Sequence, residues 1–386
     1  MNRMPCKPIS SAALLLLLGT ILPAGCGSDD PDSAQAGASG TAQPGSPPPS
    51  GESGGGQRGS GGSKAQPAAG NGGSDRTPTS DAGSTPSKSW RPFNATSPWN
   101  TPIDANAKAD PKSTELIADL IASSQWPWIT INIETYSIPV YQVDANTPLQ
   151  TVTVTSVGGQ GFNAGSAKVP IPKGALPAEG TDAHLAIVNR ATNQEWGMWS
   201  TSSTASGWTA EVAATADLSG TGVRPPTADA PWWMGHGARA CGYPLSAGLI
   251  TLDDMQAGAI EHALVIAYPH IRSRYYTSPA STAQAGFSTA LPTRGMPCGA
   301  RVQLDPTLDL ASLKLSASGK IVARALQKYG AFVGDFSGAV SLYADASPAA
   351  QSAFAKGLLD TYEVKDALTL KLFRALPIGT LLDNAN

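Results

Sequence analysis

Charge is scarce in this 386-residue chain: charged residues make up 14% of it, aromatic residues 6%, and the formal net charge is −3. No block of lysine and arginine occurs, so the sequence predicts neither nucleic acid nor an anionic membrane surface as a partner. No apolar run is long enough to cross a bilayer as a helix, which argues against a transmembrane anchor. No segment repeats, which argues against a propeller or a solenoid.

Familiar catalytic signatures are missing as well. The chain has no Gly-x-Ser-x-Gly elbow, no His-Glu-x-x-His helix, no phosphate-binding loop, no dinucleotide fingerprint and no calcium loop. No cofactor and no metal are predicted. A metal site built from Asp182, His184 and His262 stays an open alternative, although no third histidine stands at a diagnostic spacing.

Residues 1–25 have the layout of a bacterial signal peptide, with two basic residues before a short apolar run. The run ends in residues 22–26 (LPAGC), which resemble the lipobox, where small residues precede a cysteine that is lipidated. Pro23 departs from that pattern, and the alternative is an ordinary secretory signal. The sequence predicts lipidation at Cys26, a lipid bilayer as partner through this anchor, and a location in the cell envelope.

Residues 26–88 contain almost only small and polar residues and no aromatic residue. Such a segment cannot bury enough apolar surface to offset the entropy of ordering it, so a disordered tether is predicted. All nine tryptophans follow it, within residues 89–386, where one globular domain is predicted.

The predicted fold class is mainly β. Short alternating runs lie between turns rich in glycine, proline, asparagine and serine, and helical periodicity is less frequent. Strands are predicted in residues 128–133, 139–143 and 151–157, and helices in residues 115–123 and 320–329. These elements favour one large β-sandwich or jelly-roll-like domain with a few peripheral helices.

Two of the four cysteines, Cys241 and Cys298, lie in the predicted domain. Two cysteines in an exported domain indicate a disulfide, and the alternatives are two buried thiols or a metal pair.

A β-hairpin is predicted where two alternating runs flank a polar turn within residues 180–199. Pairing Val188 with Glu195 sets the register, and side chains that alternate across a strand then place His184, Glu195 and Trp199 on one face.

This face is the main candidate for a sugar site. Asp182 lies two residues before His184 and joins it there. Tryptophan stacks on the apolar face of a sugar ring, as Trp199 would here, while carboxylate and imidazole transfer protons. The small Ala186 and Gly197 would leave room for a ligand. The alternative is a histidine that packs on a tryptophan at the surface of a sheet.

His262 and Asp335 are further catalytic candidates. A helix-capping box at residues 251–254 precedes the strand predicted to carry His262, whose side chain points the same way as large apolar ones. It is either a core histidine or the floor of a pocket. Asp335 ends a short strand after a predicted helix, and its alternative role is that of a turn residue.

Aromatic and basic residues supply candidates for substrate binding. Trp232 and Trp233 form either a lid over a groove or a plug at the end of a sheet, whereas Trp99 is predicted to plug the core. Arg294 and Arg301 flank a turn before a strand and could bind an acidic sugar.

Five short segments carry a resemblance to a known group of proteins: residues 97–100 (SPWN), 182–184 (DAH), 195–196 (EW), 258–264 (GAIEHAL) and 325–330 (ALQKYG). They resemble an uncharacterised family of secreted actinobacterial and myxobacterial proteins. The resemblance covers most of residues 90–346 and implies that this span is one unit. It implies no activity.

These features together predict an exported lipoprotein that acts on an extracellular polysaccharide or a cell-envelope glycan, as a glycoside hydrolase. Acid and base would be a pair drawn from Asp182, Glu195, Glu261 and Asp335. One alternative is a polysaccharide lyase, in which a histidine removes a proton beside a uronate and an arginine or a tyrosine assists. The same features also fit a non-catalytic glycan-binding or adhesion lipoprotein, or a scaffold without a ligand.

Overall fold

The computed structural model describes residues 90–158, 162, 165–205, 207–224, 237–283 and 294–384. The chain divides into two compact units, Met1–Thr79 and Ser80–Asn386, and the described residues all belong to the second. The predictions for the signal peptide, the tether and Cys26, and those for Trp232 and Trp233, lie outside the described residues. Within the described part of the chain, no helix has the length and apolarity needed to cross a membrane.

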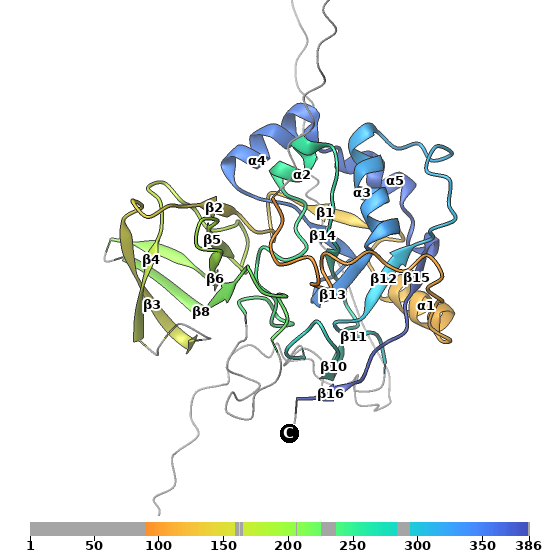
Figure 1. The fold of residues 1–386 in the computed structure, drawn as a ribbon, viewed down its shortest axis with the longest axis horizontal. Helices are drawn as coiled ribbons and strands as arrows, with labels where there is room; N and C mark the ends of the chain where they lie inside the picture. The colour runs from red at the N-terminus through yellow and green to blue at the C-terminus, as the bar shows by residue number, and fades with distance from the viewer. Residues whose placement is uncertain are drawn as a thin grey trace, which may run out of the picture. The chain divides into compact units, whose positions relative to one another are not determined.

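The described residues form sixteen strands in three sheets, with a few short helices beside them (Figure 1). The predicted mainly β class is therefore confirmed. Several neighbouring strands are parallel, among them the pairs β1–β14, β9–β13, β2–β5 and β3–β8. Parallel pairs require crossover connections in place of tight hairpins. The jelly-roll topology stays a prediction.

The six-stranded sheet lies beneath most of the helices (Figure 1). Its order is β1 (Thr130–Asn132), β14 (Ser341–Tyr343), β9 (Leu264–Ala267), β13 (Ala331–Asp335), β12 (Arg301–Leu304), β15 (Phe373–Ala375). The central strand β9, with the sequence LVIA, is buried along its whole length. A strand covered on both faces has no polar side to present, which explains its uninterrupted apolar sequence.

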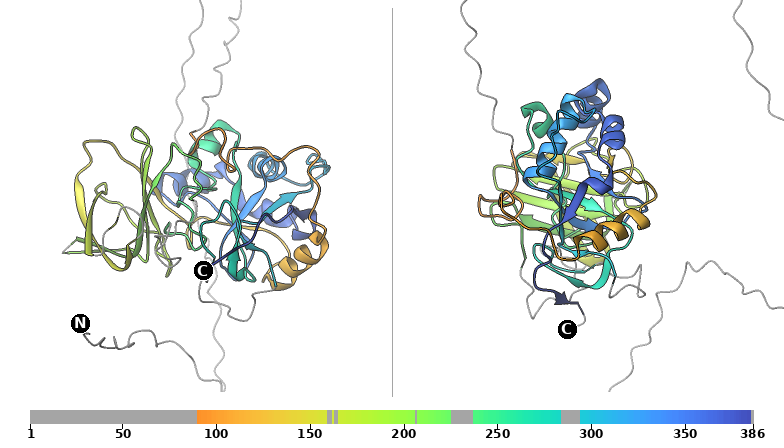
Figure 2. Two further views of the ribbon diagram at one scale, coloured as in Figure 1. Left: turned by 60° about the horizontal axis from the view of Figure 1, so that its bottom comes forward. Right: turned by 90° about the vertical axis from the view of Figure 1, so that its right-hand side faces the viewer.

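The seven-stranded sheet encloses a core of its own and lies beside the six-stranded sheet (Figures 1 and 2). Its order is β2 (Val140–Gln142), β5 (Leu185–Asn189), β6 (Gln194–Trp199), β8 (Gly207–Asp217), β3 (Leu149–Gly158), β4 (Gly165–Pro170), and β7 (Ser202–Thr204) pairs with β8.

Strand β5 separates the two hydrophobic cores. Leu185 and Ile187 belong to the smaller core, inside the seven-stranded sheet, whereas Ala186 and Val188 belong to the larger core. Because consecutive side chains point to opposite faces, this strand is buried on both sides and has lost the polar alternation of a surface strand.

The small third sheet consists of β11 (Pro297–Cys298), β10 (Arg272–Tyr276) and β16 (Leu382–Asp383). The predicted disulfide between Cys241 and Cys298 is confirmed, with 5.5 Å between the two Cα atoms. It links the long connection between β8 and β9 to β11.

Helices α2 (Leu252–Ala257), α3 (Ala317–Lys328) and α4 (Pro348–Ala353) each begin at a capping side chain. The helices predicted in residues 115–123 and 320–329 are α1 (Ser113–Ser123) and α3, and the predicted capping box opens α2. The C-terminal part, where the sequence also predicts one or two helices, holds α4, the π turn η1 (Phe354–Leu358), α5 (Thr361–Ala367) and the 3-10 turn η2 (Leu370–Leu372). Ser316 caps α3 by accepting a hydrogen bond from the backbone of Gly319, and Gly330 follows its end at φ 65°. The predicted capping box of α2 is present.

Trp99 plugs the larger core as predicted. Its side chain is 1% exposed and meets the rings of Tyr243 and Phe332 edge-on, with ring centroids 4.8 and 4.9 Å away. Such edge-to-face contacts add to the stabilisation that burial of a tryptophan supplies. The N-terminal residues of the described chain are thereby tied to the six-stranded sheet.

Candidate functional site

The predicted hairpin is β5–β6, and its register is confirmed: Val188 pairs with Glu195, and Ala186 pairs with Gly197. His184 directly precedes β5, and Glu195 and Trp199 lie on β6. Trp199 is partly buried and packs against the larger core. The face with His184 and Glu195 therefore points toward the six-stranded sheet rather than into the smaller core.

Glu195 fastens this hairpin to the connection between β8 and β9. Its side chain is 1% exposed, and its carboxylate accepts hydrogen bonds from the backbone of Leu245 at 2.6 Å and from the backbone and hydroxyl of Ser246 at 3.0 and 2.5 Å. Burial raises the pKa of Glu195, and these donors and Arg239 partly offset the rise. A carboxylate held by three donors has little freedom to bind a substrate.

The expected ligand space over Ala186 and Gly197 is filled. A Cβ atom at Gly197 would lie 3.1 Å from Cγ of Leu245, the residue that Glu195 holds in place. The small residues therefore admit a chain segment, and the expectation of a ligand there is wrong. Sequence alternation located the face but could not show which segment covers it.

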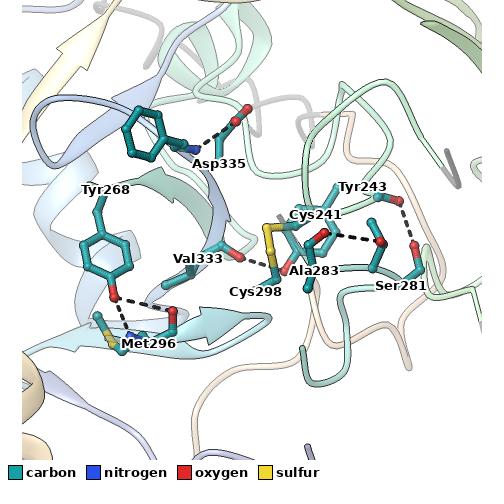
Figure 3. The surroundings of a disulfide bond; sticks show 12 residues. Cys241, Tyr243, Tyr268, Ser281, Ala283, Met296, Cys298, Val333 and Asp335 are labelled. Atoms are coloured by element: carbon teal, nitrogen blue, oxygen red, sulfur yellow. Dashed lines mark hydrogen bonds between the residues drawn. A yellow bond between two sulfur atoms is a disulfide. The ribbon is translucent and has the colours of Figure 1, made fainter. Parts of the chain in front are cut away.

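Several contacts fix the loop that carries Arg239 to strand β13. The disulfide joins Cys241 to Cys298, and the backbone N–H of Cys241 donates to the carbonyl of Gly334 at 3.3 Å. The hydroxyl of Tyr243 donates to the carbonyl of Val333 at 3.0 Å (Figure 3). The loop is thereby held beside the strand that ends in Asp335.

Arg239 is a buried arginine whose side chain is only 2% exposed. Its Nη2 donates to the carbonyl of Leu245 at 3.1 Å, and its guanidinium carbon lies 4.7 Å from the ring centroid of Tyr343. Its Nε and Nη1 have no hydrogen-bond partner. Buried polar groups are almost always paired, so two unpaired N–H groups on one buried arginine need an explanation.

His184 lies close enough to Arg239 for the arginine charge to act on it. Its ring donates a hydrogen bond to the carbonyl of Ala238, while Nδ1 is buried and has no partner. Burial and the charge of Arg239 lower the pKa of His184 to about 3, so the imidazole is neutral near pH 7. Its unpaired Nδ1 is therefore an acceptor.

Asp335 and Tyr343 bring the six-stranded sheet into the same place. Each is the last residue of its strand, β13 or β14, and their side chains share a hydrogen bond. Burial raises the pKa of Asp335 to about 6, against the opposing charge of Arg239. The charge of Asp182 adds to the rise and also acts on Tyr343.

These five residues, Asp182, His184, Arg239, Asp335 and Tyr343, are called the Arg239 centre below. Asp182 and Asp335 are partly exposed, so the centre reaches the surface, whereas the other three side chains are buried. Two of the five come from the approach to β5, one from the loop, and two from the ends of β13 and β14.

Backbone strain gathers at the edge of the Arg239 centre. Ala183, between Asp182 and His184, has φ 39°, and Ser200 has φ 52°. The two strained segments are joined, because Ser200 donates its N–H to the carbonyl of Asp182 and Thr201 donates to that of Ala183. The hydroxyl of Thr201 is buried and unpaired. Left-handed conformations cost energy for residues with a side chain and occur often at functional sites.

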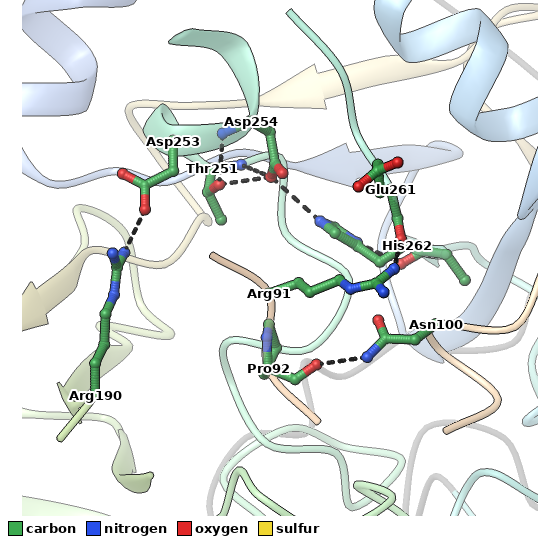
Figure 4. A network of polar contacts seen from close by, with 10 residues as sticks. Arg91, Pro92, Asn100, Arg190, Thr251, Asp253, Asp254, Glu261 and His262 are labelled. Carbon is green, nitrogen blue, oxygen red and sulfur yellow. Dashed lines mark hydrogen bonds and ion pairs between the residues drawn. The ribbon is translucent and has the colours of Figure 1, made fainter. Parts of the chain in front are cut away.

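His262 lies in a different, closed network (Figure 4). Its Nε2 is 3.2 Å from the carboxylate of Asp254, and its Nδ1 is 3.0 Å from the carbonyl of Ala263. The same Asp254 oxygen accepts from the backbone and hydroxyl of Thr251 in the capping box of α2. The strand expected to hold His262 begins only at Leu264, because the capped helix and a turn occupy the residues before it. We call Thr251, Asp254, His262 and Ala263 the His262 centre.

The remaining candidates are dispersed. Glu261 is partly exposed beside His262, and its backbone carbonyl accepts from Arg91. Arg301 donates from Nε to the carbonyl of Tyr329 and from Nη2 to that of Thr101, and Arg294 pairs with Asp119 at the surface.

Metal ligands do not gather among the described residues, where no group of three or more His, Cys, Asp or Glu side chains could hold an ion. Asp182 and His184 are therefore not joined by His262, and the alternative of a metal site on those three residues is wrong.

The sequence did not single out Arg239 or Tyr343. Neither residue belongs to a motif. Each can be recognised only in the folded structure, Arg239 as a buried charge and Tyr343 as the last residue of a strand beside that charge. Comparison of the chain with models of protein families, with curated proteins and with solved structures finds no match. The geometry alone must therefore suggest a function.

Proposed function

We propose that the Arg239 centre is the active site of an enzyme that hydrolyses a glycosidic bond in a polysaccharide. The observation that carries this proposal is that two partly exposed aspartates border the same centre, Asp182 from the approach to β5 and Asp335 from the end of β13. The charge of Asp182 acts on Asp335, and both charges act on Tyr343. Glycoside hydrolysis uses a pair of carboxyl groups on either side of the scissile bond.

In this reaction, protonated Asp335 gives its proton to the glycosidic oxygen as the bond from that oxygen to the anomeric carbon breaks. Asp182 takes a proton from a water molecule whose oxygen forms the new bond to the same carbon. The environment of Asp335 supports its role as the acid, because a pKa raised to about 6 lets it keep a proton at a higher pH than a free aspartate.

A second candidate is β-elimination on a uronate, and the unpaired N–H groups of Arg239 favour it, since such groups neutralise a carboxylate. Elimination also needs a base that removes a carbon-bound proton. A pKa of about 3 makes His184 a weak base, and a pKa raised well above its usual value keeps Tyr343 protonated. Hydrolysis is therefore the better-supported reaction.

We propose that this activity takes place outside the cytoplasm, and two features of the sequence support this location. The lipobox-like residues 22–26 support a lipid anchor at Cys26, and residues 26–88 support a tether that lets the enzyme reach a glycan of the cell envelope. The confirmed disulfide agrees with an oxidising compartment.

The test uses the full chain and a panel of neutral and acidic polysaccharides. New reducing ends and the ultraviolet absorbance of an unsaturated uronate are followed in parallel. Hydrolysis yields reducing ends without absorbance. We expect Asp335→Asn to lower the rate by about 10²- to 10⁴-fold, because it removes the proton donor but keeps an acceptor for the N–H of Phe336.

A matched control is Asp309→Asn, an exposed turn aspartate that also accepts from a backbone N–H, and it should leave the rate unchanged. With Asp335 as the acid, kcat/KM falls as the pH rises through about 6. Ultraviolet absorbance that rises at the same rate as chain cleavage would contradict hydrolysis and indicate elimination. If the Asp335→Asn enzyme is as fast as the control, Asp335 is not the proton donor of the reaction.

A further inference from the structure

We infer that the substrate of this centre is an acidic polysaccharide, and that the unpaired N–H groups of Arg239 bind the carboxylate of a uronate residue. This inference rests on the proposed function for its location, and it adds the chemical class of the substrate. It starts from the hydrogen bonds that the guanidinium group does not make.

A guanidinium group carries five N–H donors in a fixed planar arrangement. In Arg239, the carbonyl of Leu245 takes one N–H of Nη2, and both Nε and Nη1 are unpaired. The second N–H of Nη2 lies parallel to an N–H of either Nε or Nη1, whichever side Leu245 leaves free. In both cases one complete edge with two parallel donors remains, and this is the arrangement that grips a carboxylate with two hydrogen bonds.

The carboxylates near Arg239 do not fill this edge. Glu195 gives its oxygens to Leu245 and Ser246, and Asp335 gives its own to Phe336 and Tyr343. Both interact with the arginine through space, as the lowering effect of Arg239 on each pKa shows. The protein therefore balances the charge of the guanidinium but leaves its donors without acceptors, which is costly in a buried position unless a ligand supplies them.

The other unpaired atoms nearby suit the rest of a sugar. Nδ1 of the neutral His184 is an acceptor, and the hydroxyl of Thr201, which adjoins Ala183, can donate or accept. Sugar hydroxyl groups complement both. A uronate ring offers both kinds of group, a carboxylate for Arg239 and hydroxyls for His184 and Thr201.

The experiment compares one polyuronate with the same polymer after its carboxyl groups have been reduced to primary alcohols. The full chain is tested on both for new reducing ends and for retention in gels that contain the polymer. We expect reduction of the carboxyl groups to lower cleavage and retention on the order of 10²-fold or more, because the arginine edge is then left unpaired. This comparison needs no variant and does not depend on how a substitution folds.

The variant Arg239→Lys keeps the charge and loses the planar edge, so retention on the polyuronate should fall at least about tenfold. Arg324→Lys is the matched control, since Arg324 is an exposed arginine on α3, and it should retain the polymer normally. The unfolding midpoint of each variant is measured alongside.

The outcomes separate the two proposals. Cleavage of the reduced polymer as fast as of the polyuronate would overturn the uronate and leave hydrolysis standing. Retention that depends on the carboxyl groups without any cleavage would support the uronate and overturn hydrolysis. Retention of a sulfated neutral polymer in place of the polyuronate would also overturn the uronate.

Discussion

Two histidines, His184 and His262, are equally deeply buried in this unit, and each lies beside a charged residue, but their hydrogen bonding differs. Both ring nitrogens of His262 have partners, Asp254 and Ala263. His184 has one partner, the carbonyl of Ala238, and its Nδ1 has none. The first histidine belongs to a complete network, and the second belongs to a network with open positions.

The pKa values of the two histidines are also shifted in opposite directions. For His262, burial works against protonation, but the charge and hydrogen bond of Asp254 outweigh it and raise the pKa. For His184, burial and the neighbouring Arg239 act in the same direction and lower the pKa. The ion pair of His262 with Asp254 is complete within the protein, whereas the unpaired groups around Arg239 are those for which we propose a ligand. Hydrogen-bond completeness therefore separates these two sites better than residue type does.

The strongest test of this contrast is removal of Asp254. Asp254→Ala takes the partner from His262 and the cap from α2, so we expect a loss of about 3–5 kcal/mol in the free energy of unfolding. Urea unfolding at neutral pH measures it. The control is Asp253→Ala, whose side chain pairs with Arg190 at 2.7 Å near the surface and should cost at most about 1 kcal/mol (Figure 4). Equal costs for the two variants would mean that the His262 centre is not structural.

Glu195→Gln tests whether Glu195, which lies near the Arg239 centre, has a structural role. A glutamine offers one oxygen, so one of the backbone N–H groups of Leu245 and Ser246 loses its acceptor, at a cost of about 1–3 kcal/mol in the free energy of unfolding. Turnover per folded molecule should change only a few-fold. Thermal unfolding and activity are measured on the same preparation. Lost turnover at unchanged stability would move Glu195 into the catalytic machinery.

A further test is the difference in pH dependence between His184→Gln and His262→Gln. The lowered pKa of His184, about 3 against 6.5, gives a stability contribution that is complete above pH 6.5 and is lost as the pH falls toward 3. The raised pKa of His262 gives a contribution that is complete below 6.5 and is lost as the pH rises through the raised value.

His184→Gln should therefore flatten the acid side of the stability profile, by up to about 1.4 kcal/mol per pH unit, and His262→Gln the alkaline side. Urea unfolding of both variants and of the natural chain, from about pH 4 to pH 8, measures the slopes. Identical slopes in the two variants would remove the distinction between the two histidines.

Local patterns predicted local structure well. The turn and alternation of residues 180–199 were sufficient for the hairpin and its register, and the capping residues of α2 and the stop at Gly330 were found where expected. Each of these depends on residues close in sequence, whose geometry is set by the backbone periodicity. The cysteine pair followed from the number of cysteines in the domain.

Long-range contacts could not be predicted in this way. Arg239 comes within reach of His184 and Asp335 only after two sheets and a loop have packed together. The sequence predicted Arg294 and Arg301 as anion binders, but Arg301 donates to the carbonyls of Tyr329 and Thr101, and Arg294 pairs with Asp119 at the surface. The binding of an acidic sugar, which the sequence predicted for Arg294 and Arg301, is proposed here for Arg239. Sequence spacing does not show which arginine is buried with unpaired donors.

The disulfide also has a consequence for when this protein matures. It closes a span of 57 residues, for which a chain-entropy model gives about 4 kcal/mol of stabilisation, and it holds the loop two residues from Arg239. Thiols of this kind remain reduced in a typical cytosol and become oxidised after export. For the exported protein that we propose, a newly made chain would lack this link in the arginine loop until it has crossed the membrane. The disulfide would then secure the Arg239 centre only where its proposed glycan is found.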